Sequence, residues 1–525
     1  MGELENRIAG ARSHALGDVL RRTAARHPDK LALVERDVRW TFRELDAAVN
    51  RTANALAERG VGHGDRIALV SHNCWQYAVT TFALARLGAI LVPVNFMLKS
   101  DEVAYILTHS GASGVITEDG MAEVVVPAVT SAKLTGGLRG WISLAGAGPP
   151  PGWEDISPWA LAGSDAEPGV LVADDDPLRL MYTSGTESRP KGVILSSRSL
   201  IAQYVSCIVD GGMEAGDIEV HCLPLYHCAQ LDCFLGPDLY LGATSVILAG
   251  AEPGAILRTI QAEGITKFFA PPTVWISILR HPDFESTDLS SLVKGYYGAS
   301  AMPVEVLREI QQRIPQLQLW NFYGQTEMAP LATILPPRDQ VKHAGSAGRP
   351  ALNVETRVVD DDDRPLPAGE VGEIVHRSPQ STLGYWNDPA KTAEAYRNGW
   401  FHSGDLGYIT AEGLLSVVDR KKDMIKTGGE NVASREVEEA IYLHPGVAEV
   451  AVFATTHPVW VEAVTAAVVA KPGAELSSDA IIEHCRRHLA TFKAPKLVFI
   501  VETLPKNPSG KLLKRELREL YQPSQ

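Results

Sequence analysis

Residues 181–193 combine hydroxyl groups, glycines and one lysine in a single short stretch. The stretch follows the apolar residues 178–181 and precedes a helix that we predict from about residue 197. Small residues expose backbone N–H groups, and hydroxyls with an ammonium complete an anion cradle, so this composition suits a polyphosphate. It is not a Walker A loop, because Pro190 stands where that loop has its second glycine. Alone, such a stretch is more often a surface loop.

Further stretches bring together side chains that could do related chemistry. Residues 321–327 join an aromatic ring to a carboxylate, and a flat ring suits a purine while a carboxylate suits a hard cation. Residues 399–405 end in an aspartate, residues 427–432 contain paired glycines, and residues 504–511 end in a lysine. Residues 419–426 are a charged run, which by default is a solvated linker. Each stretch is a weak or moderate signal by itself.

In their order along the chain these stretches resemble the motifs of the adenylate-forming (ANL) superfamily of AMP-binding enzymes. That superfamily contains acyl-CoA synthetases, peptide-synthetase adenylation domains and luciferases. The first stretch is similar to its phosphate motif, except that Glu187 replaces a hydroxyl residue and Ser188 replaces a glycine, while Ser403 replaces the usual threonine of a later motif. The resemblance covers nearly the whole chain. It implies an AMP-forming acid–thiol ligase, an acyl-CoA synthetase that uses ATP, Mg²⁺ and CoA.

The resemblance implies a nucleotide site assembled from all of these stretches. Tyr323 would stack on adenine, Asp405 and Arg420 would bind the ribose, Thr326 would contact phosphate, and Glu327 would help to hold Mg²⁺. The metal ligands would be Glu327 and Thr183, and the catalytic residues Lys511, Glu327, Thr183 and Lys191. The full set of expected nucleotide-binding residues is Thr183, Ser184, Gly185, Thr186, Lys191, Gly298, Ala299, Ser300, Asn321, Tyr323, Gly324, Thr326, Asp405 and Arg420.

The same resemblance implies two half-reactions in one site. In the first, Lys511 would bridge the substrate carboxylate and the α-phosphate, since a mobile point charge suits both groups. A small C-terminal domain would then pivot at the hinge residue Lys422 and withdraw Lys511. Gly428 and Gly429 would replace it and line a tunnel for the thiol, because glycines permit close approach of a thin chain.

The acyl group would bind beside the nucleotide. By the resemblance, His227 would be a gate between acyl and thiol sites, although a packed core histidine is the competing interpretation. Gln230 and Asp232 would add polarity, a hint toward a small or functionalised acid, and Gln203 is a further candidate wall. The expected acyl pocket consists of Tyr204, His227, Gly298, Ala299 and Ser300.

The elements that must position these residues read as an α/β protein. The 525 residues exceed one hydrophobic core, so two or more domains are expected. Short strands alternate with helices over the first part, for example strand 66–70, helix 75–87 and strand 90–94, which predicts parallel sheets. We predict a large, multi-subdomain N-terminal adenylation domain over 1–419, a small mobile α+β domain over 423–525, and a hinge near 419–423.

Composition limits the classes of protein and partner. The net charge of −14 argues against bulk attraction to nucleic acid or an anionic membrane. No apolar run approaches the ~20 residues of a spanning helix, so stable membrane insertion is not expected. Six cysteines are too few for a disulfide framework in a chain of this length, which favours reduced thiols and a cytoplasmic protein. The sequence leaves the oligomeric state open, a homodimer included.

Several alternatives remain at this point. The acceptor could be a carrier-protein thiol, an amine or water instead of CoA, and another oxyanion could replace the carboxylic acid. An idle nucleotide-binding or regulatory protein on the same fold is the alternative of another class. A metal site around Cys222, Cys228 and Cys233 with His221 and His227 matches no familiar zinc spacing, so buried thiols are favoured.

Overall fold

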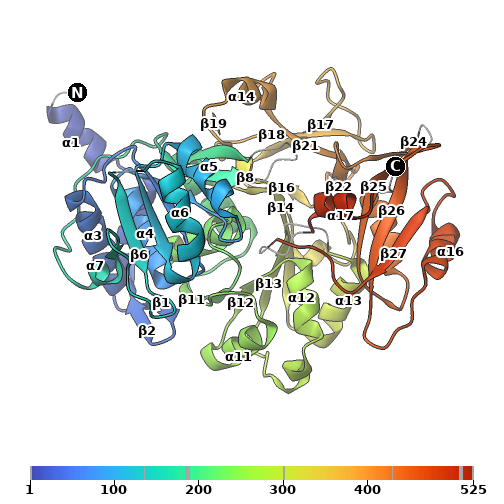
Figure 1. Cartoon of the computed structure of the whole chain (residues 1–525), viewed down its shortest axis with the longest axis horizontal. Coiled ribbons are helices and arrows are strands. Elements are labelled where there is room, and N and C mark those ends of the chain that lie inside the picture. Colours follow the sequence, from blue (N-terminus) through green and yellow to red (C-terminus); the bar gives the residue numbers. More distant parts are fainter. Residues whose placement is uncertain are drawn as a thin grey trace.

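The computed structural model describes residues 3–134, 136–183, 190–298, 302–427, 430–507 and 512–522. In Figure 1 the N-terminal and central parts form a broad α/β body, and β25, β26, β27 and α16 lie together at the right. The expected fold class is therefore confirmed: helices pack on parallel sheets, and a smaller α+β unit follows at the C-terminal end.

One eight-stranded sheet contains the stretch that we predict to bind phosphate. Its order is β19-β9-β8-β4-β3-β5-β6-β7, with β9, β8 and β19 joined in antiparallel pairs and the other strands parallel. Strands buried on both faces are typical of such sheets, and β4 is buried throughout. The strands are β3 (Arg66–Val70), β4 (Ile90–Pro93), β5 (Gly114–Glu118), β6 (Leu138–Ile142), β7 (Glu154–Asp155), β8 (Pro177–Thr183), β9 (Lys191–Ser196) and β19 (Gly384–Tyr385).

A nine-stranded sheet contains the stretch with the aromatic ring and the carboxylate. Its order is β16-β15-β14-β13-β12-β10-β11-β1-β2, parallel from β14 to β1 and antiparallel at both edges. The strands are β1 (Leu31–Glu35), β2 (Val38–Thr41), β10 (Ile218–His221), β11 (Thr244–Ile247), β12 (Lys267–Phe269), β13 (Lys294–Gly298), β14 (Gln318–Gly324), β15 (Leu331–Leu335) and β16 (Arg349–Pro350).

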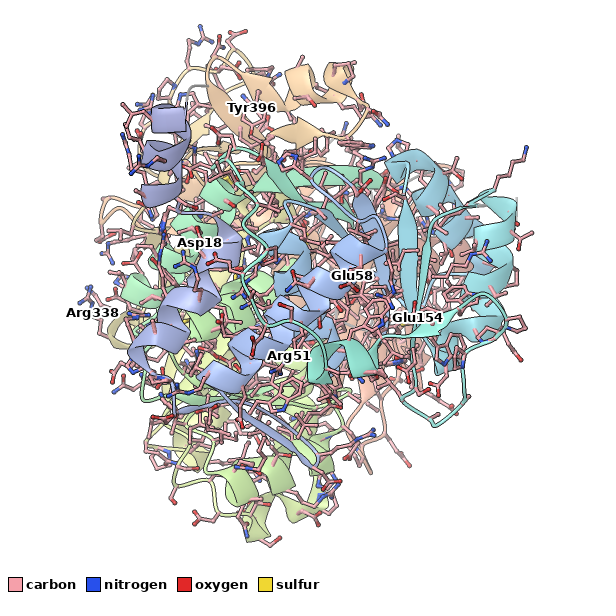
Figure 2. The ribbon with its side chains drawn as sticks, turned by 90° about the vertical axis from the view of Figure 1, so that its left-hand side faces the viewer. Asp18, Arg51, Glu58, Glu154, Arg338 and Tyr396 are labelled. Atoms are coloured by element: carbon pink, nitrogen blue, oxygen red, sulfur yellow. The ribbon has the colours of Figure 1, made fainter. Side chains whose placement is uncertain are left out.

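Helices cover these two sheets. The longest, α3, begins with a capping box, in which Glu44 N donates to Thr41 Oγ1 and Thr41 N donates to Glu44 Oε2. Figure 2 shows α3 at the surface, with Arg51 and Glu58 labelled on it and Glu154 beside it. The helices are α1 (Glu3–Ala11), α2 (Leu16–Arg26), α3 (Phe42–Glu58), α4 (Trp75–Arg86), α5 (Ser100–Ser110), α6 (Ala122–Ser131), α7 (Ser157–Leu161), α8 (Ser197–Asp210), α9 (Cys228–Gln230), α10 (Gly236–Leu241), α11 (Pro253–Glu263), α12 (Pro272–Leu279) and α13 (Val304–Arg313).

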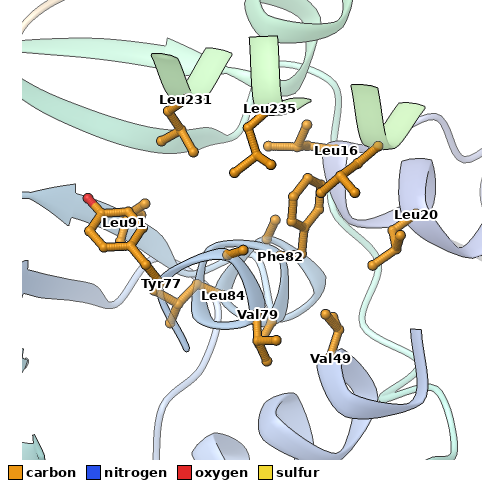
Figure 3. Close-up of a cluster of buried hydrophobic side chains, with 14 of the residues drawn as sticks. Leu16, Leu20, Val49, Tyr77, Val79, Phe82, Leu84, Leu91, Leu231 and Leu235 are labelled. Atoms are coloured by element: carbon orange, nitrogen blue, oxygen red, sulfur yellow. The ribbon is translucent and has the colours of Figure 1, made fainter. Parts of the chain in front are cut away.

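A continuous hydrophobic core joins the two sheets. Figure 3 shows Tyr77 and Phe82 of α4 facing Leu231 and Leu235, with Leu16 of α2 beside them. All five side chains belong to one buried cluster that extends from α2 to the residues after α9. Because this apolar packing spans both sheets, the sheets are held in a fixed relative position.

An antiparallel sheet follows the large sheets and leads to the C-terminal part. It contains β17 (Glu355–Val359), β18 (Gly372–Arg377), β20 (Tyr396–Arg397), β21 (Trp400–Ile409) and β22 (Leu415–Arg420), and α14 (Pro389–Ala395) precedes β20. The final sheet contains β23 (Ile425–Thr427), β24 (Glu430–Val432), β25 (Val447–His457), β26 (Val461–Ala470) and β27 (Leu497–Val501). Helices α15 (Ser434–Tyr442), α16 (Ser478–His488) and α17 (Lys514–Leu520) complete this unit.

Element predictions from the sequence agree closely with the structure. Strand 66–70 is β3, helix 75–87 is α4, and strand 90–94 is β4, each to within one residue at its ends. These segments were predictable because long apolar runs and helical periodicity are local signals. The domain boundaries at 419 and 423 remain a prediction.

Candidate functional site

The predicted adenine-binding segment lies at the carboxyl end of β14, an interior strand of the nine-stranded sheet. The strand ends at Gly324, where an added Cβ would lie 1.9 Å from the carbonyl oxygen of Pro330, so only glycine fits. Gly298, at the end of β13, likewise lies against the carbonyl of Phe322. Asn321 Nδ2 donates to the carbonyl of Ser346 at 3.0 Å, which fixes this strand to the following loop.

Tyr323, Asp405 and Arg420 form one cluster, as the sequence predicts. The hydroxyl of Tyr323 donates to Asp405 Oδ2 at 2.6 Å, and Arg420 Nε lies 3.3 Å from Asp405 Oδ1. Burial and the carboxylate of Asp405 raise the pKa of Tyr323, so its hydroxyl remains a donor. The buried Oδ1 of Asp405 has no hydrogen-bond donor among the described residues, because its contact with Arg420 lacks hydrogen-bond geometry. A sugar hydroxyl would supply that donor.

The phosphate stretch is described only at its two ends. Thr183 and Lys191 are directly paired across β8 and β9, so the two described ends of the predicted phosphate stretch lie side by side. The predicted phosphate ligands Ser184, Gly185 and Thr186, together with Glu187 and Ser188, lie outside the described residues.

Tyr385 connects two of the predicted catalytic residues, and the sequence analysis missed it. Its hydroxyl donates to Glu327 Oε1 at 2.9 Å, and Lys191 Nζ lies 5.3 Å from the centre of its ring. Burial, followed by the carboxylate of Glu327, raises the pKa of Tyr385, so the hydroxyl stays protonated. Only the pairing of β19 with β9 places Tyr385 here, so no local pattern could have identified it.

Glu327 and Thr183 offer the type of ligand that Mg²⁺ takes. A carboxylate and a hydroxyl are hard oxygen donors, so the donor set fits this cation. The carbonyl of Glu327 accepts from Thr382 N at 2.7 Å, which fixes the turn. The neighbouring Thr326 Oγ1 lies 3.4 Å from Cys228 Sγ, which connects this turn to α9.

His227 lies at the start of α9. Its Nδ1 accepts a hydrogen bond from Ala229 N at 3.1 Å, which requires the unprotonated nitrogen there and puts the ring proton on Nε2 when the ring is neutral. Tyr204 is fully buried, and its hydroxyl donates to Asp232 Oδ1 at 3.2 Å. Burial raises the pKa of Asp232 to about 6, although Arg179 opposes this shift. The predicted pocket residues Ala299 and Ser300 lie outside the described residues.

Gln203 and Gln230 are both buried. Gln203 Nε2 lies 2.8 Å from Cys207 Sγ and 3.2 Å from Cys233 Sγ. The side chain of Gln230 is hydrogen-bonded to His221 and to the backbone of Leu223. The polarity that the sequence places near the acyl group is therefore engaged within the protein.

The hinge prediction falls on a partly exposed turn. Lys421 N donates to the carbonyl of Gly404 at 2.9 Å, and Arg518 Nη2 donates to Asp423 Oδ1 at 2.7 Å. Burial, followed by the charge of Arg420, lowers the pKa of Lys422. The predicted tunnel residues Gly428 and Gly429 and the predicted catalytic Lys511 lie outside the described residues.

A buried ionic cluster lies behind this site, on β10, β12 and α10. Glu219, His221 and Asp238 place ligand-type atoms within 4.8 Å of one another. Lys267 is also there: its ammonium bonds to Asp238 and lies 2.8 Å from Glu219 Oε2. Since an ammonium already neutralises these carboxylates, a metal ion is not favoured there. The six cysteines are free and buried, which confirms the interpretation as buried thiols.

Comparison with known proteins identifies the class to which this fold and site belong. Residues 20–386 match the model of the AMP-binding enzyme family, and residues 436–511 match its C-terminal domain. The chain belongs to the AMP-binding enzyme family, which confirms the resemblance in the motifs.

Individual relatives narrow the class. The chain is 36% identical over 510 residues to the feruloyl-CoA synthase of Amycolatopsis sp, covering 97% of this chain and 100% of the relative. It is 34% identical to the long-chain-fatty-acid–CoA ligase FadD13 of Mycobacterium tuberculosis, covering 96% and 98%. The crystal structure of the anthranilate CoA ligase AuaEII with anthranoyl-AMP has TM-score 0.90 and 26% identity, covering 98% and 99%. These names agree with the predicted enzyme class, an AMP-forming acid–thiol ligase.

The helices within the described parts of the chain are too short or too polar to span a bilayer.

Proposed function

We propose that this protein activates a carboxylic acid with ATP as an acyl adenylate and then transfers the acyl group to CoA. The observation that supports this most directly is the Tyr323–Asp405–Arg420 cluster, with its unfilled carboxylate oxygen beside an aromatic ring. This cluster offers the groups that a nucleoside needs: a ring for the base and an acceptor for a ribose hydroxyl.

In the first half-reaction the substrate carboxylate oxygen forms a bond to the α-phosphorus of ATP, and the bond to pyrophosphate breaks. Lys191 and Lys511 would neutralise the charge that develops on the phosphates. Mg²⁺ is the proposed cation, and when bound by Glu327 and Thr183 it would supply further positive charge there. Tyr385 would hold the carboxylate of Glu327 in place through its 2.9 Å hydrogen bond.

In the second half-reaction the thiol sulfur of CoA attacks the acyl carbonyl carbon, and the bond to AMP breaks. We propose that the large domain covers 1–419 and the mobile domain 423–525, with a hinge near 419–423 at Lys422. Its rotation would exchange Lys511 for Gly428 and Gly429. The side chains of Arg420 and Lys421 are 40% and 51% exposed, and this exposure supports a hinge here.

The substrate is proposed to be an organic acid with an apolar acyl group. Phe234 is buried, and the centre of its ring lies 4.2 Å from that of Phe269 and 5.6 Å from that of Phe322 in stacked arrangements. Phe322 directly precedes Tyr323 in the sequence. The relatives named above act on aromatic and long-chain acids, which is consistent with an apolar wall but does not choose between them. A cytoplasmic location and a homodimer are further proposals, for fractionation and sedimentation to test.

The experiment is pyrophosphate release by the purified protein with MgATP and a panel of short, medium, long and aromatic acids, each with and without CoA. We expect release with one class of acid, an increase with CoA, and an acyl-CoA product by mass spectrometry. Release that is independent of CoA would favour another acceptor. The absence of release with every acid would contradict the proposal and favour another oxyanion or an idle nucleotide-binding protein.

A further inference from the structure

Asn73 connects the two large sheets at their carboxyl ends. It lies in the loop between β3 of the eight-stranded sheet and α4, and it is 1% exposed. Its side chain reaches the loops after β10 and β11 of the other sheet: Nδ2 donates to the carbonyls of Leu223 at 2.8 Å and Leu248 at 3.1 Å. Oδ1 accepts from Leu225 N at 2.8 Å. One buried amide therefore fixes the backbone of a segment about 150 residues away.

The orientation of this amide is determined by its partners. The Nδ2 end of the amide faces the carbonyls of Leu223 and Leu248, and a third carbonyl, that of His221, lies 3.5 Å away. The Oδ1 end faces the N–H group of Leu225. Exchanging oxygen and nitrogen would place a carbonyl against three carbonyls and an NH₂ against an N–H group. Asn73 is thus matched in both halves to the backbone that it contacts, and neither aspartate nor leucine would reproduce the match.

The loop that holds Asn73 is itself rigidly bound. His72 N donates to Glu118 Oε2 at 2.8 Å, and Ser71 Oγ donates to the same oxygen at 3.0 Å. Trp75 N donates to Glu35 Oε2 at 2.6 Å, which ties the start of α4 to β1 of the other sheet. The loop that contains Asn73 is therefore held by residues of both sheets.

The segment that Asn73 contacts, residues 223–227, ends at His227. A second buried amide also binds this segment, since Gln230 Oε1 accepts from Leu223 N at 3.2 Å and Gln230 Nε2 bonds to His221 Nδ1 at 2.8 Å. Through Cys228, α9 also touches Thr326 of the predicted nucleotide site. These contacts fix the backbone at His227 relative to the site where the acyl adenylate would form.

We propose that Asn73 is a positioning residue for acyl transfer, fixing the segment 223–227 and thereby the ring of His227. The inference rests on the proposed function, because it takes His227 to act between the acyl and thiol sites. Asn73 itself touches no reacting atom in this account. Its removal should free the segment to move and misplace His227, with the greater effect on the half-reaction that needs the thiol to reach the acyl carbonyl.

The test compares wild type with Asn73→Ala, His227→Ala and the double variant in both half-reactions. Acid-dependent pyrophosphate release in a single turnover without CoA reports adenylation, and acyl-CoA formation after CoA is added to the enzyme-bound adenylate reports transfer. We expect Asn73→Ala to slow transfer about tenfold and adenylation less than about twofold. The double variant should transfer within about twofold of the slower single variant, because two residues that act as a unit are not additive.

Hydrogen exchange measured by mass spectrometry gives a readout that does not depend on activity. Peptides covering residues 223–231 should exchange faster in Asn73→Ala than in wild type. The matched control is Asn50→Ala, which removes another buried amide. Asn50 accepts a hydrogen bond from Arg86, which is at the opposite end of α4 from Asn73. This control should lower stability without changing either half-reaction or the exchange of 223–231.

Three results would overturn the proposal: equal slowing of both half-reactions, additive effects in the double variant, or unchanged exchange over 223–231. If Asn73→Ala does not fold, Asn73→Ser is measured in the same cycle, because its hydroxyl is too short to span both loops. If the wild-type protein forms no acyl adenylate, the proposed function itself is refuted. This measurement needs the wild type alone.

Discussion

The protein contains two joints that differ in how their groups are shielded from water. The joint between the large sheets is made by buried groups: Asn73 is 1% exposed, and Glu35 of β1, which accepts from Trp75 N, is 8% exposed. The joint that leads to the C-terminal sheet includes charged groups at the surface: the side chains of Arg420 and Lys421 are 40% and 51% exposed. Water competes with the second set of contacts and is excluded from the first.

The first joint is also more tightly packed than the second. A continuous hydrophobic cluster crosses the first joint. At the interface of α12 and α13 with the C-terminal unit there is instead a cavity of about 90 Å³, lined among others by Ile276, Val306, Val447 and Lys471. The two large sheets are therefore fixed relative to each other by buried contacts. The contacts near the proposed hinge at 419–423 are weaker, because water competes with them.

The largest effect is expected for the buried ions behind the first joint. Burial raises the pKa of Glu219 well above its usual range. Burial also acts to raise the pKa of Asp238, but Lys267, His221 and Glu219 together outweigh it, so this pKa is lowered. Lys267→Ala leaves Asp238 buried without its ammonium partner, so the free energy of unfolding should fall by about 3–5 kcal/mol in a denaturant titration.

The matched change at the second joint is Lys421→Ala. It removes exposed ion pairs with Asp361 and Glu373 at 3.2 Å and 3.5 Å, and should cost less than about 1 kcal/mol. Similar losses in the two variants would contradict the distinction between the joints.

The next largest effect is a pH dependence of stability that we expect from Asp232, close to the first joint. Its carboxyl has a pKa of about 6 in the folded protein, above the usual value of 3.8, because it is buried. The folded state therefore binds a proton between about pH 4 and pH 6 that the unfolded state does not, and this group adds stability as the pH falls. The stability of wild type relative to Asp232→Asn should increase by at most ~3 kcal/mol between pH 7 and pH 4. A difference that is constant or decreases on acidification would exclude this origin.

The second joint can be stiffened with Lys422→Pro. Proline fixes φ and so restricts rotation at the proposed hinge. We expect acyl transfer to slow about 30- to 100-fold while adenylation changes by less than about threefold, as measured in separate half-reactions. Transfer at the wild-type rate would place the pivot elsewhere, and equal loss of both steps would indicate misfolding, which circular dichroism would detect.

The smallest effect is expected for the hydroxyl of Tyr385. Tyr385→Phe keeps the ring beside Lys191 but removes the hydrogen bond to Glu327, worth about 0.5–1.5 kcal/mol. The affinity for MgATP should fall about three- to tenfold in calorimetry. Tyr385→Leu, which removes the ring as well, should weaken binding further. Equal affinity in wild type and Tyr385→Phe would show that Glu327 is positioned without this residue.

Much of the fold was predictable because its signals are local. The runs that form β3, α4 and β4 have apolar composition and periodicity that depend only on neighbouring residues. Tyr323, Asp405 and Arg420 were predicted from motif order, and the structure brings them together. For Lys511, Gly428 and Gly429, the predicted roles remain predictions.

The sequence by itself determined the family, the chemistry that its motifs share, and the order of the elements. The tertiary structure alone decided the contacts of Asn73 and Tyr385, whose partners Leu223 and Glu327 lie 150 and 58 residues away. An asparagine after a strand or a tyrosine after a glycine has no local property that specifies a distant partner. Such contacts follow from how the sheets pack together, which depends on the whole core and leaves no pattern in the neighbouring residues.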